Sequence, residues 1–283
     1  MKTKTFILSV MLILIASTAS TKPTVFVSIL PQKYFVEKIA GNLLDIQVMV
    51  LPAASPATYE PSPRQMAKLS KASLYFSIGV PFEKKWLPKI HNLFPDLKIV
   101  HTDRGIAKRH MHSKHHQQKS KYEPDPHIWL SPSLAMIQAR HIFFALQEFS
   151  PNNRKLFNQN YHRLINKIAK LDTELIEILS QIQHKSFMVF HPSWGYFASD
   201  YRLNQIPIEV EGKSVKSSQL VKLIDRARTS NIHAIFAQPQ FSTKSAGLIA
   251  REIGGQLILI DPLALDWGNN LRSVATKMKM NDK

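Results

Sequence analysis

The chain has 283 residues, a formal net charge of +17 and no cysteine. This length allows one large or two ordinary domains, and the missing cysteine excludes disulfides as a source of stability. Residues 21–150 carry 17 basic and 9 acidic side chains, and residues 151–283 carry 18 and 11. The excess of positive charge is thus spread evenly over the two halves of the chain, without a basic tail or an interleaved aromatic stripe. This distribution argues against a nucleic-acid partner.

The N-terminus has the layout of a secretory signal peptide. Two lysines precede an apolar run from Phe6 to Ala16, and small residues close the run before Thr21. The run is short for a membrane span, although an N-terminal membrane anchor is the alternative. We therefore expect residues 1–20 to be removed and the mature chain to be exported. No cysteine stands at the cleavage point, so no lipid anchor is expected.

Eight short runs, rich in β-branched and aromatic residues, predict strands. They form one set near each end of the chain: Thr24–Ile29, Ile46–Leu51, Leu74–Gly79 and Lys98–Thr102, then Phe187–His191, Ile206–Val210, Ala234–Ala237 and Gln256–Ile260. Helix-length segments separate them, such as Gln32–Ile39, Ser62–Lys71, Ser217–Thr229 and Ser242–Ile253. Apolar strands that alternate with helices indicate parallel sheets. The predicted fold class is α/β, with two lobes of mainly parallel sheet.

Between the two sets, residues 151–183 predict one long amphipathic helix. Its apolar side chains recur at spacings of four and three residues: Leu164, Ile168, Leu171, Leu175, Ile178 and Ile182. Pro151 after Ser150 suits the first helical turn. A coiled-coil seam fits the same spacing, but the run is short for one. The predicted organisation is a signal peptide at 1–20, an N-terminal lobe at 21–150, the linking helix at 151–183 and a C-terminal lobe at 184–283.

The segment Arg104–Glu123 is predicted to be a solvated, mobile loop, because it has no apolar period. It contains four histidines, at positions 110, 112, 115 and 116. Clustered imidazoles on a loop can chelate a metal ion without imposing one geometry. The alternative is a polar loop that coordinates metal only incidentally.

Three side chains are candidate metal ligands. His191 ends the apolar run FMVF, Asp261 ends LILI, and His127 lies in DPHIW. In open α/β sheets, ligands bind beyond the carboxyl ends of the strands. Two imidazoles and a carboxylate suit zinc or another first-row divalent ion. Each residue also has a structural interpretation, as a hydrogen-bonded histidine or as an aspartate that caps the next turn.

Five motifs then carry a family resemblance: SPATYEPSPRQM, DPHIWLSP, FHPSWGYFASDYRL, FAQPQFSTKSA and LIDPLA. In these motifs and their order, the chain resembles the periplasmic metal-binding (solute-binding) proteins of bacterial zinc/manganese ABC importers. The stretch that precedes His127 resembles the His-rich loop of the zinc-specific type. The resemblance implies a metal site between two lobes joined by a long rigid helix, and no enzymatic activity. It also implies a periplasmic monomer that delivers its ion to an ABC permease and the associated ATPase in the inner membrane.

The resemblance implies a ligand set of three histidines and one acidic residue. His127, His191 and Asp261 match three of these positions, but Ala57 stands where the family has the remaining histidine. Water, Glu60 or a histidine of the loop could complete the site, or the site has decayed. Zn²⁺ is the expected ion and Mn²⁺ is possible. Since binding needs neutral imidazoles, affinity should fall below about pH 6.5.

Other residues near the strand ends show weaker evidence of a role in the metal site. Glu211 could orient a ligand imidazole, but Glu209 and Glu211 are both interpreted as solvated loop residues. Trp194, Tyr196 and Phe197 are expected to pack at the interface between the lobes.

Two other classes of function remain as alternatives. A zinc hydrolase would use an open coordination position, but the chain has no HExxH motif and no glycine-rich phosphate loop. An adhesin or structural module on the same fold, with a degenerate metal site, would account for Ala57 and the basic surface.

Overall fold

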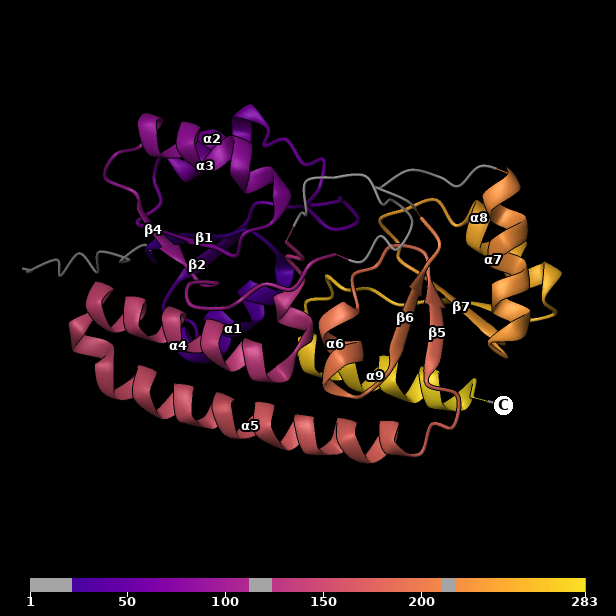
Figure 1. The fold of residues 1–283 in the computed structure, drawn as a ribbon. Helices are drawn as coiled ribbons and strands as arrows, with labels where there is room; N and C mark the ends of the chain where they lie inside the picture. Colours follow the sequence, from indigo (N-terminus) through magenta and orange to yellow (C-terminus); the bar gives the residue numbers. More distant parts are fainter. Residues whose placement is uncertain (1–21, 112–123, 210–216, 283) are drawn as a thin grey trace, which may run out of the picture.

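The computed structural model describes residues 22–111, 124–209 and 217–282. It contains two four-stranded sheets, one in each half of the chain (Figure 1). The first sheet has the order β2-β1-β3-β4 and is built from β1 (Thr24–Val27), β2 (Asp45–Val48), β3 (Leu74–Ser77) and β4 (Lys98–His101). The second has the order β6-β5-β7-β8 and is built from β5 (Ser186–Val189), β6 (Asn204–Pro207), β7 (Ala234–Ala237) and β8 (Gln256–Leu259).

All neighbouring strands in both sheets are parallel. The four carboxyl ends of each sheet therefore meet at one edge, where functional side chains gather in α/β proteins. The predicted α/β class is confirmed, and every predicted strand is present. The sixth begins two residues before its predicted start and ends at Pro207 rather than Val210. Its partner β5 sets this register, because Ser186 pairs with Asn204.

Helices cover both faces of each sheet (Figure 1). The first lobe has α2 and α3 on one side and α1 and α4 on the other: α1 (Leu30–Ala40), α2 (Pro63–Leu69), α3 (Pro81–Leu93) and α4 (Pro132–Phe149). The second lobe has α7 and α8 on its outer side and α6 and α9 facing inward: α6 (Gly195–Asp200), α7 (Ser217–Thr229), α8 (Lys244–Glu252) and α9 (Trp267–Met280). A short 3-10 helix, η1 (Ile128–Leu130), precedes α4.

One long helix, α5 (Arg154–Ser180), runs beneath both lobes. Its 27 residues span about 40 Å. It packs on α1 and α4 in the first lobe and on α9 in the second. A 3-10 turn, η2 (Pro151–Asn153), stands where the sequence predicts the first α-helical turn, a common form of helix start. The buried stripe of α5 includes Leu164, Ile168, Leu171 and Leu175, as predicted.

A single apolar core continues from the first lobe into the second. Trp267, at the start of α9, packs on Phe35 of α1 with ring centroids 5.1 Å apart. Its indole nitrogen donates to the carbonyl of Trp129, 2.6 Å away, and the Trp129 indole donates to the carbonyl of Pro262 at 2.7 Å. These two bonds cross between the lobes in opposite directions. The lobes are thus joined by buried side chains as well as by α5.

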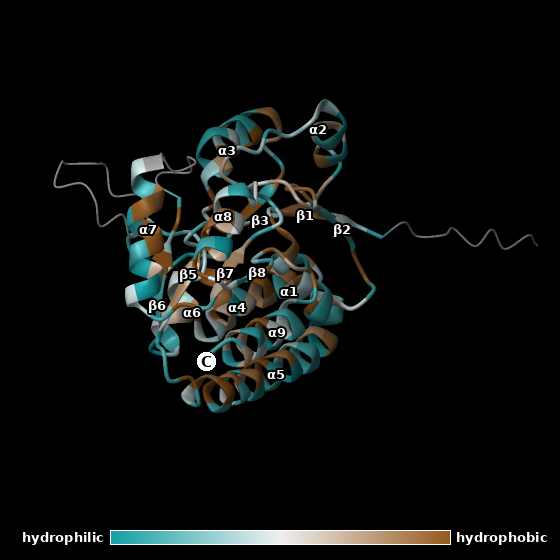
Figure 2. Cartoon of the chain, turned by 90° about the vertical axis from the view of Figure 1, so that its right-hand side faces the viewer, coloured by the Kyte–Doolittle hydropathy of each residue, from teal (hydrophilic) through white to brown (hydrophobic). Residues whose placement is uncertain are grey.

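A smaller apolar cluster lies on the outer face of the second sheet, under α7 and α8. Figure 2 shows α5 and α7 with apolar and polar sides, as expected for helices that cover a core on one face. The division of the chain at residues 150 and 183 stays a prediction.

Candidate metal centre

His127 lies just before η1, at the inner surface of the first lobe. Its main-chain nitrogen and its ring Nδ1 both contact Asp125 Oδ1, at 3.0 and 2.7 Å. His127 is 8% exposed, and its ring packs against Trp129 with centroids 5.2 Å apart. With a carboxylate on Nδ1, that nitrogen carries the proton and Nε2 keeps its lone pair. Asp125 therefore orients the imidazole so that Nε2 can bind a metal.

Burial also favours the neutral form of this imidazole. It lowers the pKa of His127 below its usual value, although the carboxylate of Asp125 acts in the opposite direction. A neutral ring at neutral pH is the form that binds a metal ion.

His191 follows the strand β5 and has the matching arrangement in the second lobe. Its Nδ1 lies 2.6 Å from Glu209 Oε1. Gln238, after β7, accepts a bond from the His191 main-chain nitrogen at 3.1 Å and donates to the His191 carbonyl at 2.7 Å. The ring stacks on Phe241, with centroids 4.8 Å apart. His191 is therefore fixed in the same tautomer as His127, with Nε2 available.

Glu209 corrects one sequence interpretation. The residue is only 6% exposed and binds the imidazole of His191, so it is not a solvated loop residue. The reason is the sheet order: β6 lies beside β5, and the main-chain nitrogen of Glu209 donates to the carbonyl of Phe190 at 3.1 Å. Glu211, the residue first considered for such a role, lies outside the described residues.

The two imidazoles face each other across the boundary between the lobes. Their ring centroids are 5.3 Å apart, and the rings are nearly perpendicular. Each ring has a buried carboxylate on Nδ1. Within the described chain, Glu209 Oε2 is buried without a hydrogen-bond partner. Two imidazoles that meet at the boundary between the lobes, each with its Nδ1 bound to a carboxylate, are suitable ligands for a zinc ion.

Asp261 lies after β8, on the second-lobe side of the same boundary. Its Oδ1 accepts bonds from Gln240 Nε2 at 2.7 Å and from the Leu263 main-chain nitrogen at 2.9 Å. Asp261 and Gln240 line a small cavity whose other wall comes from the first lobe, at 29–30 and 50–53. Among the described residues, no three histidine, cysteine or acidic side chains are close enough to hold one metal ion. The structure thus brings His127 and His191 together and leaves Asp261 outside that pair, so the three-residue ligand set stays a prediction.

The positions considered for the missing ligand are less favourable. Ala57 is exposed, in the loop that follows β2. Glu60 is also exposed and forms an ion pair with Lys85, which lowers the pKa of its carboxyl. His110 forms a single bridge with Pro124 at the described ends of the predicted loop. The other three histidines of that loop lie outside the described residues.

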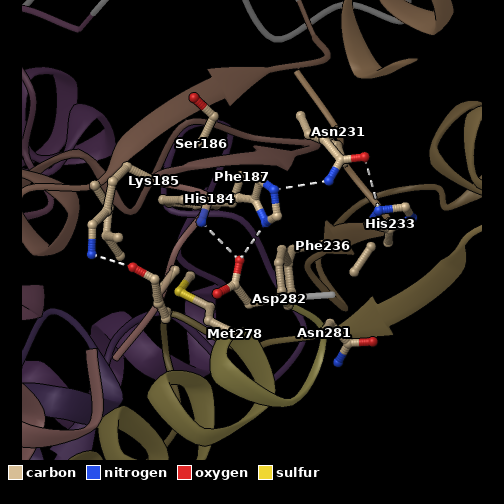
Figure 3. A pocket seen from close by; sticks show the side chains of 14 residues that line it. His184, Lys185, Ser186, Phe187, Asn231, His233, Phe236, Met278, Asn281 and Asp282 are labelled. Carbon is tan, nitrogen blue, oxygen red and sulfur yellow. Dashed lines mark hydrogen bonds and ion pairs between the residues drawn. The ribbon is translucent and has the colours of Figure 1, made fainter. Parts of the chain in front are cut away.

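A separate cavity lies at the far end of the second sheet, where the strands begin (Figure 3). There Asp282 accepts bonds from the main-chain and ring nitrogens of His184, both at 2.9 Å. Asn231 bridges His184 and His233, at 2.9 and 3.1 Å. These groups satisfy one another and face away from the carboxyl ends of the strands, so they are not part of the candidate metal centre.

A family model described as the zinc-uptake complex component A, periplasmic, matches residues 25–279. The chain belongs to this family. It is 31% identical over 260 residues to the protein named "Putative metal-binding protein" of Chlamydia trachomatis serovar D, covering 91% of each chain. It is 25% identical to the high-affinity zinc uptake system protein ZnuA of Bacillus subtilis, covering 88% of this chain and 81% of that one.

A solved structure described as ZnuA superimposes on the chain with a TM-score of 0.87 and 42% identity, covering 93% of this chain and 100% of that one. The family consists of extracytoplasmic receptors that bind metal ions and work with ABC transporters, and not of enzymes. The hydrolase alternative is therefore wrong. No helix within the described ranges is long and apolar enough to cross a membrane.

Sequence reasoning missed the partners of the two imidazoles. Asp125 has a local signal, since it stands two residues before His127 in DPH. Glu209 has only a weak signal, as an acidic residue near a strand end, and Gln238 has none, because only the order of the strands brings them to His191.

Proposed function

We propose that the chain is an extracytoplasmic zinc receptor that captures the ion between its lobes and delivers it to an ABC permease and its ATPase in the inner membrane. The observation that carries this proposal is the pair His127 and His191, each with a carboxylate on Nδ1 and Nε2 available; His127 is buried and His191 is half-buried. Imidazole nitrogens suit zinc better than manganese, which prefers oxygen ligands. Mn²⁺ remains a possible cargo.

The proposed ligands are Nε2 of His127, Nε2 of His191 and a carboxylate oxygen of Asp261, with water at the position that Ala57 leaves open. Two imidazoles, one carboxylate and a water complete a four-coordinate zinc site. Asp261 stands near the boundary between the lobes, because the carbonyl of the next residue, Pro262, accepts a bond from Trp129 of the first lobe.

Export also belongs to this proposal. Residues 1–20 are proposed to be a signal peptide, and the mature receptor to be a monomer free of lipid. The Streptococcus pneumoniae relative AdcA is named a zinc-binding lipoprotein, so the mode of anchoring varies among the relatives. The intact mass of protein recovered from a periplasmic extract decides the point, because cleavage without acylation leaves a chain that begins near residue 21.

Zinc titration calorimetry tests the function. Four proteins are compared: the mature chain, a chain lacking residues 112–121, His191→Ala, and His162→Ala as a control on the exposed face of α5. We expect one tight site per chain in all but His191→Ala. If deletion of residues 112–121 abolishes tight binding, a loop histidine supplies the missing ligand. If the mature chain itself does not bind zinc tightly, the receptor proposal is wrong and the adhesin alternative is favoured.

A further inference from the structure

The two ends of the segment 112–123 are joined to each other. The main-chain nitrogen of Asp125 donates to the carbonyl of Arg109 at 2.8 Å, and His110 forms a bridge with Pro124. Arg109 and Asp125 are therefore neighbours, although fifteen positions separate them in the chain. Both belong to the first lobe.

Tyr196, on α6 of the second lobe, binds both of these residues. Its hydroxyl accepts a bond from the Arg109 main-chain nitrogen at 2.9 Å and donates to the Asp125 carbonyl at 3.0 Å. The Arg109 guanidinium lies over the Tyr196 ring, 5.6 Å from its centroid, and donates to the carbonyl of Gly195. The Tyr196 phenol and the Arg109 guanidinium thus connect the lobes beside the two candidate ligands, His127 and His191.

The close approach depends on the glycine at position 195. A Cβ atom built on Gly195 would lie 3.0 Å from Asp125 Oδ2 and 3.5 Å from the Arg109 guanidinium carbon. A side chain at this position would require the Asp125 carboxylate to shift by a few tenths of an ångström. Glycine therefore allows the tightest contact between α6 and Asp125.

Asp125 also contacts one of the two candidate ligands, His127. Its carbonyl is held by Tyr196, while its Oδ1 binds the main-chain nitrogen and Nδ1 of His127. Tyr196 in turn lies five residues after His191, in the segment that begins α6. A short series of bonds through Asp125 and Tyr196 therefore connects the segment of His191 to the imidazole of His127.

We propose that Arg109 and Tyr196 form an interlobe clamp, a pair of positioning residues that holds His127 against His191 and so determines how slowly zinc leaves. This inference rests on the proposed receptor function. The clamp does not hold the lobes together by itself, because the Trp129 and Trp267 bonds and the shared core remain without it. Loss of the clamp should therefore loosen the site without unfolding the chain.

The test measures the rate of zinc release from the full mature chain after mixing with an excess of chelator. The variants are Tyr196→Phe, which removes both hydroxyl bonds, and Arg109→Gln. Matched controls are Tyr161→Phe, a tyrosine stacked on Phe143, and Arg154→Gln, whose guanidinium also donates to a main-chain carbonyl, that of Gln147. Arg109→Lys is the conservative variant, since an ammonium can still donate to the Gly195 carbonyl.

We expect each clamp variant to release zinc about 10-fold faster, with one zinc per chain and an unchanged rate of binding. The double variant should be less than additive, because the two residues act as one unit. Arg109→Lys should recover most of the slow release. The visible absorption of bound Co²⁺ should change in the clamp variants and not in the controls, since it reports the geometry of the ligands.

Three results distinguish failure of the clamp from failure of the receptor function. If the unaltered chain binds zinc and the clamp variants release it at the unaltered rate, the clamp is wrong and the receptor function stands. Faster release with an unchanged Co²⁺ spectrum and a lowered melting temperature would show a general structural role, and would also overturn the clamp. If the unaltered chain binds no zinc, the receptor function fails first and the clamp fails with it.

Discussion

The two lobes have the same strand order, yet they use the carboxyl edges of their sheets in opposite ways. In the first lobe the polar groups at this edge satisfy one another. Glu83 accepts bonds from Ser28 Oγ at 2.5 Å and from the main-chain nitrogens of Ile78 and Gly79 at 3.0 and 2.7 Å. Gln32 donates to Thr102 at 3.0 Å. All of these side chains are buried. We call this group of residues, and not the loop after β2, the closed edge.

In the second lobe the corresponding edge supplies the candidate centre. His191, Glu209, Gln238 and Asp261 follow its four strands, one after each. The first lobe contributes its imidazole from a different place, the residue before η1. The comparison shows that strand order determines where functional groups can stand, while the pairing of side chains determines whether they face a ligand.

The largest expected effect separates two histidines of the first lobe. His127→Ala removes a proposed ligand and should weaken zinc binding by more than about 100-fold. His101→Ala removes a histidine at the end of β4, whose Nδ1 lies 2.8 Å from Ser77 Oγ on the closed edge. It should leave the zinc affinity within about 2-fold of the unaltered value. Calorimetry of both variants checks this, and equal losses would contradict the contrast between the edges.

The next effect concerns stability and the closed edge. Burial raises the pKa of Glu83 to about 7, although its hydrogen bonds from Ser28, Ile78 and Gly79 oppose the rise. The folded state therefore holds a proton that the unfolded state has released above about pH 4.5. The stability of the zinc-free protein should contain a contribution that is complete below about pH 4.5 and is lost as pH rises to about 7, at most about 3 kcal/mol.

Urea unfolding from pH 4.5 to 8, with a chelator present, measures this contribution. Glu83→Gln cannot titrate, so the stability difference between the two proteins should change with pH in the stated direction, whatever the absolute stability of the variant. A difference that stays constant with pH would show that Glu83 titrates alike in both states. Zinc affinity should be the same in both proteins.

A smaller effect is expected at the second lobe's buried carboxylate. Glu209→Gln keeps the shape of the side chain but removes the charge that orients and strengthens the His191 imidazole. Zinc affinity should fall by about 10- to 100-fold. The free energy of unfolding of the zinc-free chain should change less than for Glu83→Gln. Competition titrations and urea unfolding are measured for both variants. A loss of zinc affinity in Glu83→Gln alone would contradict the assignment of the metal centre to the second lobe's edge.

The smallest effect is a gain. Ala57→His places a donor in the exposed loop after β2, at the position where the resemblance implies the remaining family histidine. If water occupies that position, the new imidazole should replace it and raise zinc affinity by about 10-fold. The variant combined with deletion of residues 112–121 distinguishes water from a loop histidine. A gain only in the deleted chain would show that the loop fills the position.

Much of the architecture could be predicted from local pattern. The runs that became β1 to β8 are short and apolar, and the spacing from Leu164 to Leu175 gave the long helix its buried side. Helix boundaries and the start of β6 differ by a few residues, because hydrogen bonds to neighbouring elements decide them. His127 and His191 could also be selected as candidate ligands, since each lies in a family motif and His191 ends an apolar run.

The sequence by itself determined the class of fold, because periodicity and motifs are properties of neighbouring residues. It also predicted the export signal and selected His127 and His191 as candidate ligands. Only the tertiary structure decided what those imidazoles contact. Glu209 reaches His191 because β6 pairs with β5, and Tyr196 reaches Asp125 because the lobes meet there. Such contacts join residues 18 and 71 positions apart, and no local pattern encodes a distance in space between them.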